Sequence, residues 1–160
     1  MARLHSPPVT RRPFEITRDV LTSASPEEVL AIVRSPATWP QWQSEIVTTE
    51  GPDPVTPGDV VRGDASMLGF EVDGHSTIET SSESILDEDV IVGLRMRVTY
   101  SVELVGDRTR LRHKFSARLP GGVWGGLLAL FMRRRFRKMQ RDLLADLARH
   151  VERAAKKPAG

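Results

Sequence analysis

The sequence predicts an α+β fold in which a curved antiparallel sheet of about seven strands wraps around a long C-terminal helix. Between residues 45 and 119, short segments of alternating apolar and polar residues are separated by Gly, Pro and Asp turns, which is typical of antiparallel strands. After residue 122, apolar residues recur every three or four positions, which indicates an amphipathic helix of roughly 30 residues, or about 45 Å. Such a helix needs a large concave surface to bury its apolar face. A strongly curved sheet provides that surface.

The N-terminal third predicts one strand followed by two short helices. Apolar residues alternate from Phe14 onward, which indicates the first strand. Ser25 is a typical N-cap, Pro26 suits the first helical position, and Glu28 completes a capping box. Pro36 interrupts this helix, so a second short helix or turn is expected over SPATWPQW.

The central segment predicts six further strands. The Gly106-Asp107-Arg108 turn indicates a hairpin between the last two, whereas no turn is evident within GLRMR, between the fourth and fifth of the six. The expected strands cover residues 45–50, 60–68, 70–81, 90–94, 96–105 and 109–119. We expect one domain over residues 13–155, a flexible N-terminal arm over residues 1–12 and a flexible tail over residues 156–160.

Composition excludes several classes of function. The chain has no cysteine, so it has no disulfide, thiolate nucleophile or Cys-based metal site. It has no apolar run long enough for a spanning helix and no apolar signal segment near its start, so a cytoplasmic location is expected. The net charge of +2 hides an asymmetry: residues 123–160 carry ten Lys/Arg and three Asp/Glu, or +7, and the remainder carries −5. A solvated helix face is the simplest interpretation of this basic segment.

These features together resemble the START-like, or SRPBCC, superfamily, and within it the polyketide cyclase/dehydrase-like branch. The resemblance covers residues 14–153 and depends on ASPEEVLAIVRSPATWPQW, the Pro57-Gly58 strand opener, the hairpin VTYSVELVGDRTRLRHKF, and LPGG followed by the helix. It implies a helix-grip fold with a pocket between the sheet and the helix. The superfamily includes lipid-transfer proteins, receptors, aromatase/cyclases and quinone-binding proteins, so the resemblance implies the fold more strongly than the chemistry.

Strand alternation predicts which side chains face the pocket. On residues 109–119, the set that contains Arg110, Arg112 and Lys114 is uniformly polar and must face solvent, which turns His113 inward. Tyr100 is placed inward in the same way. These two are the candidate catalytic residues if the protein is an enzyme, although a buried histidine that is hydrogen-bonded to the backbone is the simpler interpretation.

The predicted ligand-binding residues share an inward position on a strand, a place near the pocket mouth, or the apolar face of the long helix. They are Trp39, Trp42, Phe70, Val72, Gly74, Ser76, Ile78, Val98, Tyr100, Val102, His113, Phe115, Trp124, Leu128, Phe131 and Met132. Trp39 and Trp42 suit either a gate at the mouth or a plug of core aromatics. The start of the helix, with its paired glycines, suits a mobile lid.

Three functions remain open. The leading hypothesis is a non-catalytic carrier of a small hydrophobic molecule, such as a polyketide, lipid or quinone, without cofactor or metal, in a cavity of several hundred Å³. The second is a polyketide aromatase/cyclase, with Arg62 or Arg95 as oxyanion partner.

The third hypothesis is an interaction module that uses the basic helix on a membrane, RNA or another protein. Arg133, Arg134, Arg137 and Lys138 are candidates for peripheral contact with an anionic membrane. Nucleic acid is disfavoured because no exposed aromatic platform or known nucleic-acid motif is present. Asp73 and His75 give only a weak metal signal because a third ligand is missing. The sequence does not predict the oligomeric state.

Overall fold

The computed structural model describes residues 13–67, 69–119 and 122–157, without the side chains of Val123 and Trp124. Its elements follow the order expected from the sequence. They are β1 (Phe14–Thr22), α1 (Pro26–Val33), the 3-10 helix η1 (Pro36–Thr38), α2 (Trp39–Trp42), β2 (Ile46–Glu50), β3 (Val60–Met67), β4 (Phe70–Ser81), β5 (Ile85–Val92), β6 (Leu94–Val105), β7 (Arg108–Ala117) and α3 (Val123–Lys156). The predicted N-terminal arm and the last three residues of the predicted tail lie outside the described residues.

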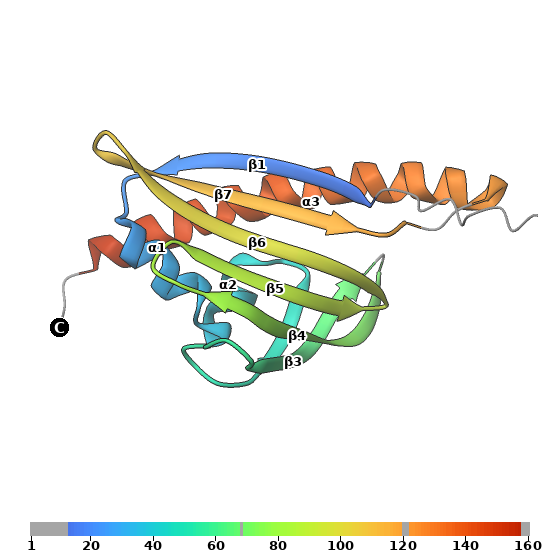
Figure 1. Cartoon of the computed structure of the whole chain (residues 1–160), viewed down its shortest axis with the longest axis horizontal. Coiled ribbons are helices and arrows are strands. Elements are labelled where there is room, and N and C mark those ends of the chain that lie inside the picture. Colours follow the sequence, from blue (N-terminus) through green and yellow to red (C-terminus); the bar gives the residue numbers. More distant parts are fainter. Residues whose placement is uncertain (1–12, 68, 120–121, 158–160) are drawn as a thin grey trace, which may run out of the picture.

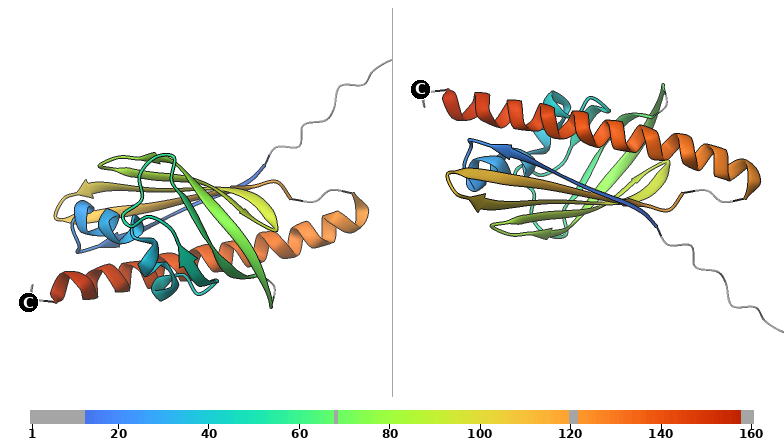
Figure 2. Two further views of the ribbon diagram at one scale, coloured as in Figure 1. Left: turned by 90° about the horizontal axis from the view of Figure 1, so that it is seen from below. Right: turned by 90° about the horizontal axis from the view of Figure 1, so that it is seen from above.

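The seven strands form one antiparallel sheet in the order β1-β7-β6-β5-β4-β3-β2. The sheet curves around α3, and α1 and α2 pack at one end of the helix (Figures 1 and 2). This arrangement confirms the predicted helix-grip fold. The other end of α3, at its N-terminus, extends past the ends of β1 and β7 (Figure 2).

The local signals near the N-terminus form the predicted contacts. The Ser25 hydroxyl accepts a hydrogen bond from the Glu28 backbone N–H, and the Glu28 carboxylate accepts one from the Ser25 N–H. This capping box satisfies two of the donors that a helix N-terminus leaves free. Val29, Leu30 and Val33 then bury their side chains against β5, β6 and α3.

One of the six central strands begins five residues before its predicted start, whereas the other five begin and end within two residues of the prediction. The strand expected at residues 90–94 is β5, which begins at Ile85, and the turn to β6 is Gly93 alone, with φ of 64°. A single glycine suffices because its backbone enters the left-handed region without the steric cost that other residues meet. The sequence 85–89 contains three consecutive acidic residues, which obscured the strand pattern.

Two glycines allow neighbouring strands to approach each other closely, β4 to β5 at Gly74 and β3 to β2 at Gly63. A Cβ at Gly74 would lie 2.7 Å from the Ile91 carbonyl oxygen and 2.9 Å from the Val92 Cβ. A Cβ at Gly63 would lie 2.1 Å from the Thr48 carbonyl oxygen. The absent side chain at Gly74 therefore serves backbone packing, and the space for a ligand that the sequence suggested stays a prediction.

Candidate functional site

A cavity of about 140 Å³ lies between the concave face of the sheet and α3. Apolar side chains provide most of its wall, with Val90, Val98 and Phe115 from the sheet and Phe136 and Met139 from the helix. The cavity is smaller than the several hundred Å³ that we expected. Phe136 from the helix and Phe115 from the sheet are both buried at its wall, with ring centroids 4.7 Å apart. A cavity of about this size in another protein accommodates benzene, so there is room for a single ring.

A row of four polar side chains crosses the inner face of the sheet on neighbouring strands. Ser76 on β4 donates a short hydrogen bond to Glu88 on β5. Glu88 lies diagonally across from Tyr100 on β6, and Tyr100 is directly opposite His113 on β7, with ring centroids 4.8 Å apart. All four residues are buried and all four border the cavity. We call this set the polar row.

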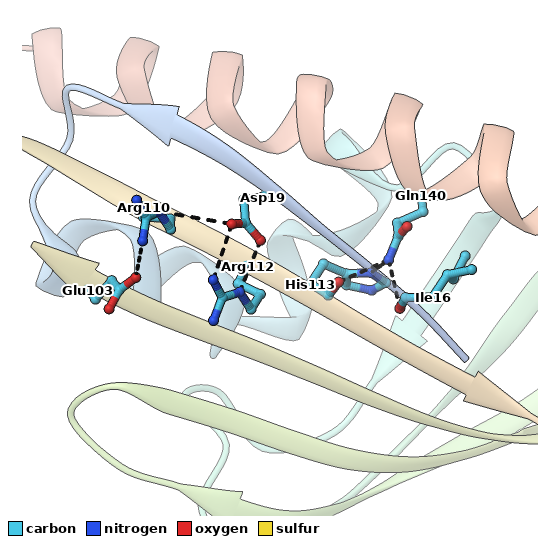
Figure 3. Close-up of polar contacts among 7 residues, drawn as sticks. All are labelled: Ile16, Asp19, Glu103, Arg110, Arg112, His113 and Gln140. Atoms are coloured by element: carbon cyan, nitrogen blue, oxygen red, sulfur yellow. Dashed lines mark hydrogen bonds and ion pairs between the residues drawn. The ribbon is translucent and has the colours of Figure 1, made fainter. Parts of the chain in front are cut away.

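α3 fixes one end of the polar row through Gln140. Its side-chain nitrogen lies 2.9 Å from the His113 carbonyl oxygen, 3.3 Å from the Ile16 carbonyl oxygen and 3.0 Å from Nδ1 of His113 (Figure 3). The two carbonyl acceptors identify this nitrogen as the amide NH₂, whose two hydrogens are shared among three acceptors. Because an amide nitrogen does not accept a hydrogen bond, the Nδ1 that faces it is the unprotonated ring nitrogen of His113. The remaining ring nitrogen, Nε2, then carries the proton of the neutral imidazole. His113 is thus a hydrogen-bond donor at Nε2.

Burial sets the protonation of the other members. It raises the pKa of Glu88 to about 7, against a partly opposing hydrogen bond from Ser76. Burial also lowers the pKa of His113 to about 4, so the imidazole is neutral at neutral pH. Burial, and secondarily the charge of Glu88, raise the pKa of Tyr100 well above its ordinary value. Tyr100 and His113 are therefore uncharged donors, and Glu88 is the member that titrates near neutral pH.

Glu88 is the residue that sequence reasoning missed. The strand expected over residues 90–94 does not include it, whereas in the structure Leu86, Glu88 and Val92 are buried on one face of β5. The neighbours Asp87 and Asp89 point outward and pair with Arg97 and Arg95. The alternation Leu86, Glu88, Val90, Val92 was the available signal, but it became visible only once β5 was extended to Ile85.

The polar face of β7 points to solvent as predicted. Arg112 pairs with Asp19 on β1, with Nε 3.0 Å from Oδ1, and Arg110 pairs with Glu103 on β6 at 2.6 Å (Figure 3). These ion pairs lie on the opposite face of β7 from His113. Such exposed pairs contribute little to stability, but they fit the placement of the polar set outside and of His113 inside.

Seven of the predicted ligand-binding residues border the cavity: Trp39, Gly74, Ser76, Val98, Tyr100, His113 and Phe115. Another five belong to the core or pack against it without bordering the cavity: Trp42, Val72, Ile78, Val102 and Met132. The side chain of Trp124 lies outside the described part of the chain.

Three predicted lining residues are wrong because they face solvent. Phe70, at the start of β4, is 74% exposed because no described residue covers its side of the strand at the end of the β3–β4 hairpin. Alternation predicts the side of the strand but not whether another layer covers it. Leu128 and Phe131 are 45% and 54% exposed because the first turns of α3 extend past the sheet (Figure 2). These positions neither border the cavity nor cover it as a lid.

The two tryptophans after α1 are held in place by hydrogen bonds. The indole N–H of Trp39 donates to the Val33 carbonyl oxygen at 2.8 Å, and that of Trp42 donates to the Thr38 hydroxyl at 3.1 Å. Trp42 also packs edge-on against Tyr100. Both are buried core aromatics, which favours the plug over the gate.

The candidate oxyanion partners are placed differently from one another. Arg95 points away from the cavity into an ion pair with Asp89, so its proposed role is wrong. Arg62 is exposed and borders the cavity from β3, and His75 on β4 is half-buried and also borders it.

Within the described residues, no group of three or more His, Asp and Glu side chains is arranged to hold a metal ion. Nor does any helix in the described ranges have the length and apolarity needed to cross a membrane.

The curved sheet, the long helix and the cavity between them define a helix-grip domain of the START-like superfamily. The chain belongs to the polyketide cyclase/dehydrase and lipid transport family, whose model matches residues 13–152. No curated protein matches the chain significantly in a sequence comparison.

Solved structures share the fold at low sequence identity. The Thermus thermophilus protein TTHA0849 superposes with a TM-score of 0.77 and 20% identity, over 90% of this chain and 100% of that one. The Zhui aromatase/cyclase from a Streptomyces species gives 0.71 and 11%, over 92% and 99%. A START superfamily protein from Mycobacterium smegmatis gives 0.68 and 17%, over 88% and 98%. At these identities the similarity establishes the fold alone.

Proposed function

We propose that this protein binds a small apolar molecule that carries a hydrogen-bond acceptor, and that it acts as a carrier of that molecule. The observation that supports this most is the polar row, which places the donors Tyr100 and His113 side by side at the wall of an otherwise apolar cavity. A pocket with apolar walls and a few fixed polar groups is typical of small-molecule binding.

The donors favour a carbonyl-bearing ligand over a plain hydrocarbon. The Tyr100 hydroxyl and the His113 Nε2–H donate to none of the described residues, while Nδ1 of His113 is already held by Gln140. A ligand carbonyl oxygen that accepts from either donor replaces water lost on entry, and a buried donor left unpaired costs about 1–3 kcal/mol. Quinones and ketones meet this requirement. The present cavity volume limits the ligand to about one ring unless Met139 or Leu143 moves.

A matched pair of probes tests this proposal. Acetophenone and α-methylstyrene have nearly the same shape and differ by a carbonyl oxygen in place of a methylene group. Isothermal titration should show that acetophenone binds about tenfold more tightly, which is the worth of one such hydrogen bond. The preference should fall in the Tyr100→Phe and His113→Phe variants, and both probes should lose affinity when Val90→Phe fills the cavity. Equal affinities in the wild type, or a preference that survives both donor variants, would overturn the proposal.

A polyketide aromatase/cyclase is the second candidate, and Glu88 is the observation that favours it. Aldol condensation and dehydration need a group that exchanges protons near neutral pH, and a carboxyl with a pKa of about 7 suits general acid–base catalysis. If this function is correct, Glu88→Gln should abolish turnover of a poly-β-keto substrate while acetophenone binding persists. Unchanged turnover in Glu88→Gln would remove Glu88 from the chemistry, and no turnover by the wild type would favour the carrier.

A further inference from the structure

The first turns of α3 expose a cluster of large apolar side chains. Leu127, Leu128, Leu130 and Phe131 are between 45% and 66% exposed, in the part of the helix that extends past β1 and β7 (Figure 2). At 100° per residue they spread over roughly 160° of the helix circumference, and Leu127 lies opposite the buried Phe136. An exposed apolar cluster of this kind marks an interaction site.

A band of positive charge follows at once along the helix. Residues 123–132, which we call the α3 tip, contain no charged side chain, whereas five of the six residues in 133–138, the cationic collar, are Arg or Lys. The collar divides into two groups. Arg133 and Arg137 lie over the ring of Phe14, 5.5 and 5.6 Å from its centroid, and Lys138 pairs with Asp142.

Arg134 and Arg135 are the uncommitted charges of the collar. Both are exposed, and neither forms an ion pair with any described residue. The undescribed residues contain no Asp or Glu side chain that could neutralise them. Arg134 follows Leu130 by four positions and Arg135 follows Phe131 by four, so each guanidinium lies one turn above an exposed apolar side chain. Along the helix axis, from the N-terminus of α3 onward, an uncharged apolar segment is therefore followed by a band of positive charge.

We propose that the α3 tip inserts into one leaflet of an anionic membrane, with Arg134 and Arg135 at the level of the lipid headgroups. Ten residues of helix span about 15 Å, which is half of a hydrocarbon core of about 30 Å. Ala129 and Met132 pack against the protein, so only the exposed side of the tip enters one leaflet, without crossing it. Phosphates at the interface complement the two free arginines.

The inference stands apart from the proposed ligand, since no residue of the polar row belongs to the tip or the collar. It adds a membrane surface at which a carrier would take up or release its apolar ligand. It also bears on the membrane contact predicted from the sequence: Arg134 has no ion-pair partner among the described residues, whereas Arg133 and Arg137 contact Phe14 and Lys138 pairs with Asp142.

Co-sedimentation with vesicles tests the charge component. The wild-type protein should bind vesicles of equal parts phosphatidylcholine and phosphatidylglycerol more tightly than vesicles of phosphatidylcholine alone. The double variant Arg134→Gln/Arg135→Gln should bind the anionic vesicles roughly 25-fold more weakly, at about fivefold for each charge. The matched control Arg153→Gln/Lys156→Gln removes two charges from the other end of the same helix, roughly 28 Å along its axis. That distance exceeds a Debye length of about 8 Å, so the control should change binding less than twofold.

Insertion is measured directly with a single label. The chain has no cysteine, so Leu127→Cys carries one nitrobenzoxadiazole dye at the tip and Lys156→Cys carries one at the far end. Anionic vesicles should shift the emission of the tip label to the blue and leave the other label unchanged. The variant Leu127→Ser/Phe131→Ser should lose at least tenfold in vesicle binding, because burying either side chain contributes at least that factor.

Three results would overturn the inference. The first is a wild-type protein that does not bind anionic vesicles at low salt. The second is an equal loss in the collar variant and the control, which would indicate a helix lying flat on the surface. The third is concentration-dependent self-association that the tip variant abolishes without any vesicle binding, which would identify the tip as an interface between two copies of the chain. Circular dichroism of each variant establishes that it is folded before any loss is interpreted.

Discussion

Replacing Glu88 by glutamine should make the protein more stable, and the gain should grow with pH. Burial raises the pKa of Glu88 from 4.5 to about 7, so between these values the native state holds a proton that the unfolded chain has released. Stability therefore falls as pH rises through this window. The full difference is 2.5 pH units, which at 1.36 kcal/mol per unit amounts to about 3 kcal/mol above pH 7.

His113 has the opposite effect, so the wild-type protein alone is a poor test. Burial lowers its pKa from 6.5 to about 4, and the unfolded chain binds the extra proton as pH falls through that window. Stability therefore rises with pH where the effect of Glu88 makes it fall. Between about pH 4.5 and 6.5 the two contributions nearly cancel.

The comparison of wild type with Glu88→Gln removes this cancellation. Glutamine keeps the shape of a protonated glutamate and an acceptor for the Ser76 hydroxyl, while His113 is common to both proteins. Urea denaturation followed by tryptophan fluorescence, at intervals from pH 4 to 8, gives the free energy of unfolding of each. The advantage of Glu88→Gln should increase by about 3 kcal/mol between pH 4.5 and 7. A difference that stays constant across this range would refute the buried, proton-binding state of Glu88.

Three further variants test the packing that shapes the cavity. Gly74→Ala should lower the free energy of unfolding by about 1–3 kcal/mol, because its Cβ would meet the Ile91 carbonyl oxygen. The control Gly126→Ala, in an open helical position, should leave the free energy of unfolding unchanged or raise it by up to about 1 kcal/mol. Equal effects of the two variants would contradict the close approach of β4 and β5. Gln140→Leu should cost about 1–3 kcal/mol by removing the hydrogen bonds from its amide to the His113 and Ile16 carbonyl oxygens, and a fully neutral result in chemical denaturation would show that the amide does not hold α3 to the sheet. Ser25→Ala should lose about 1 kcal/mol with the α1 cap, which thermal unfolding monitored by circular dichroism would detect, and no loss would argue against that cap.

The sequence predicted the fold well where local signals and burial agree. The capping box at Ser25 and the long apolar periodicity of α3 act within one turn or one helix, so neither depends on distant contacts. The inward placement of His113 was also predictable, since the other face of β7 is a run of cations that only solvent accommodates.

The rest depended on tertiary contacts that strand alternation does not encode. Glu88 was missed because three consecutive acids resemble a loop, and its buried place is set by the register of β5 against β6 and by Ser76 on β4. Phe70 and Phe131 were assigned to the pocket because they fall on the correct side of their elements, yet both lie beyond the part of the sheet that α3 covers. Alternation gives the side of a strand, and the extent of the opposing layer decides whether that side is buried.

The most direct test of the central claim is to locate a bound probe by NMR. Acetophenone should be titrated into uniformly ¹⁵N- and methyl-labelled protein, and the shift changes mapped onto the residues. We predict saturable changes concentrated at Gly74, Val98, His113 and Met139, which border the cavity, and their loss in Val90→Phe. Changes that are absent, that do not saturate, or that fall on the outer face of the sheet would contradict a ligand-binding cavity between the sheet and α3.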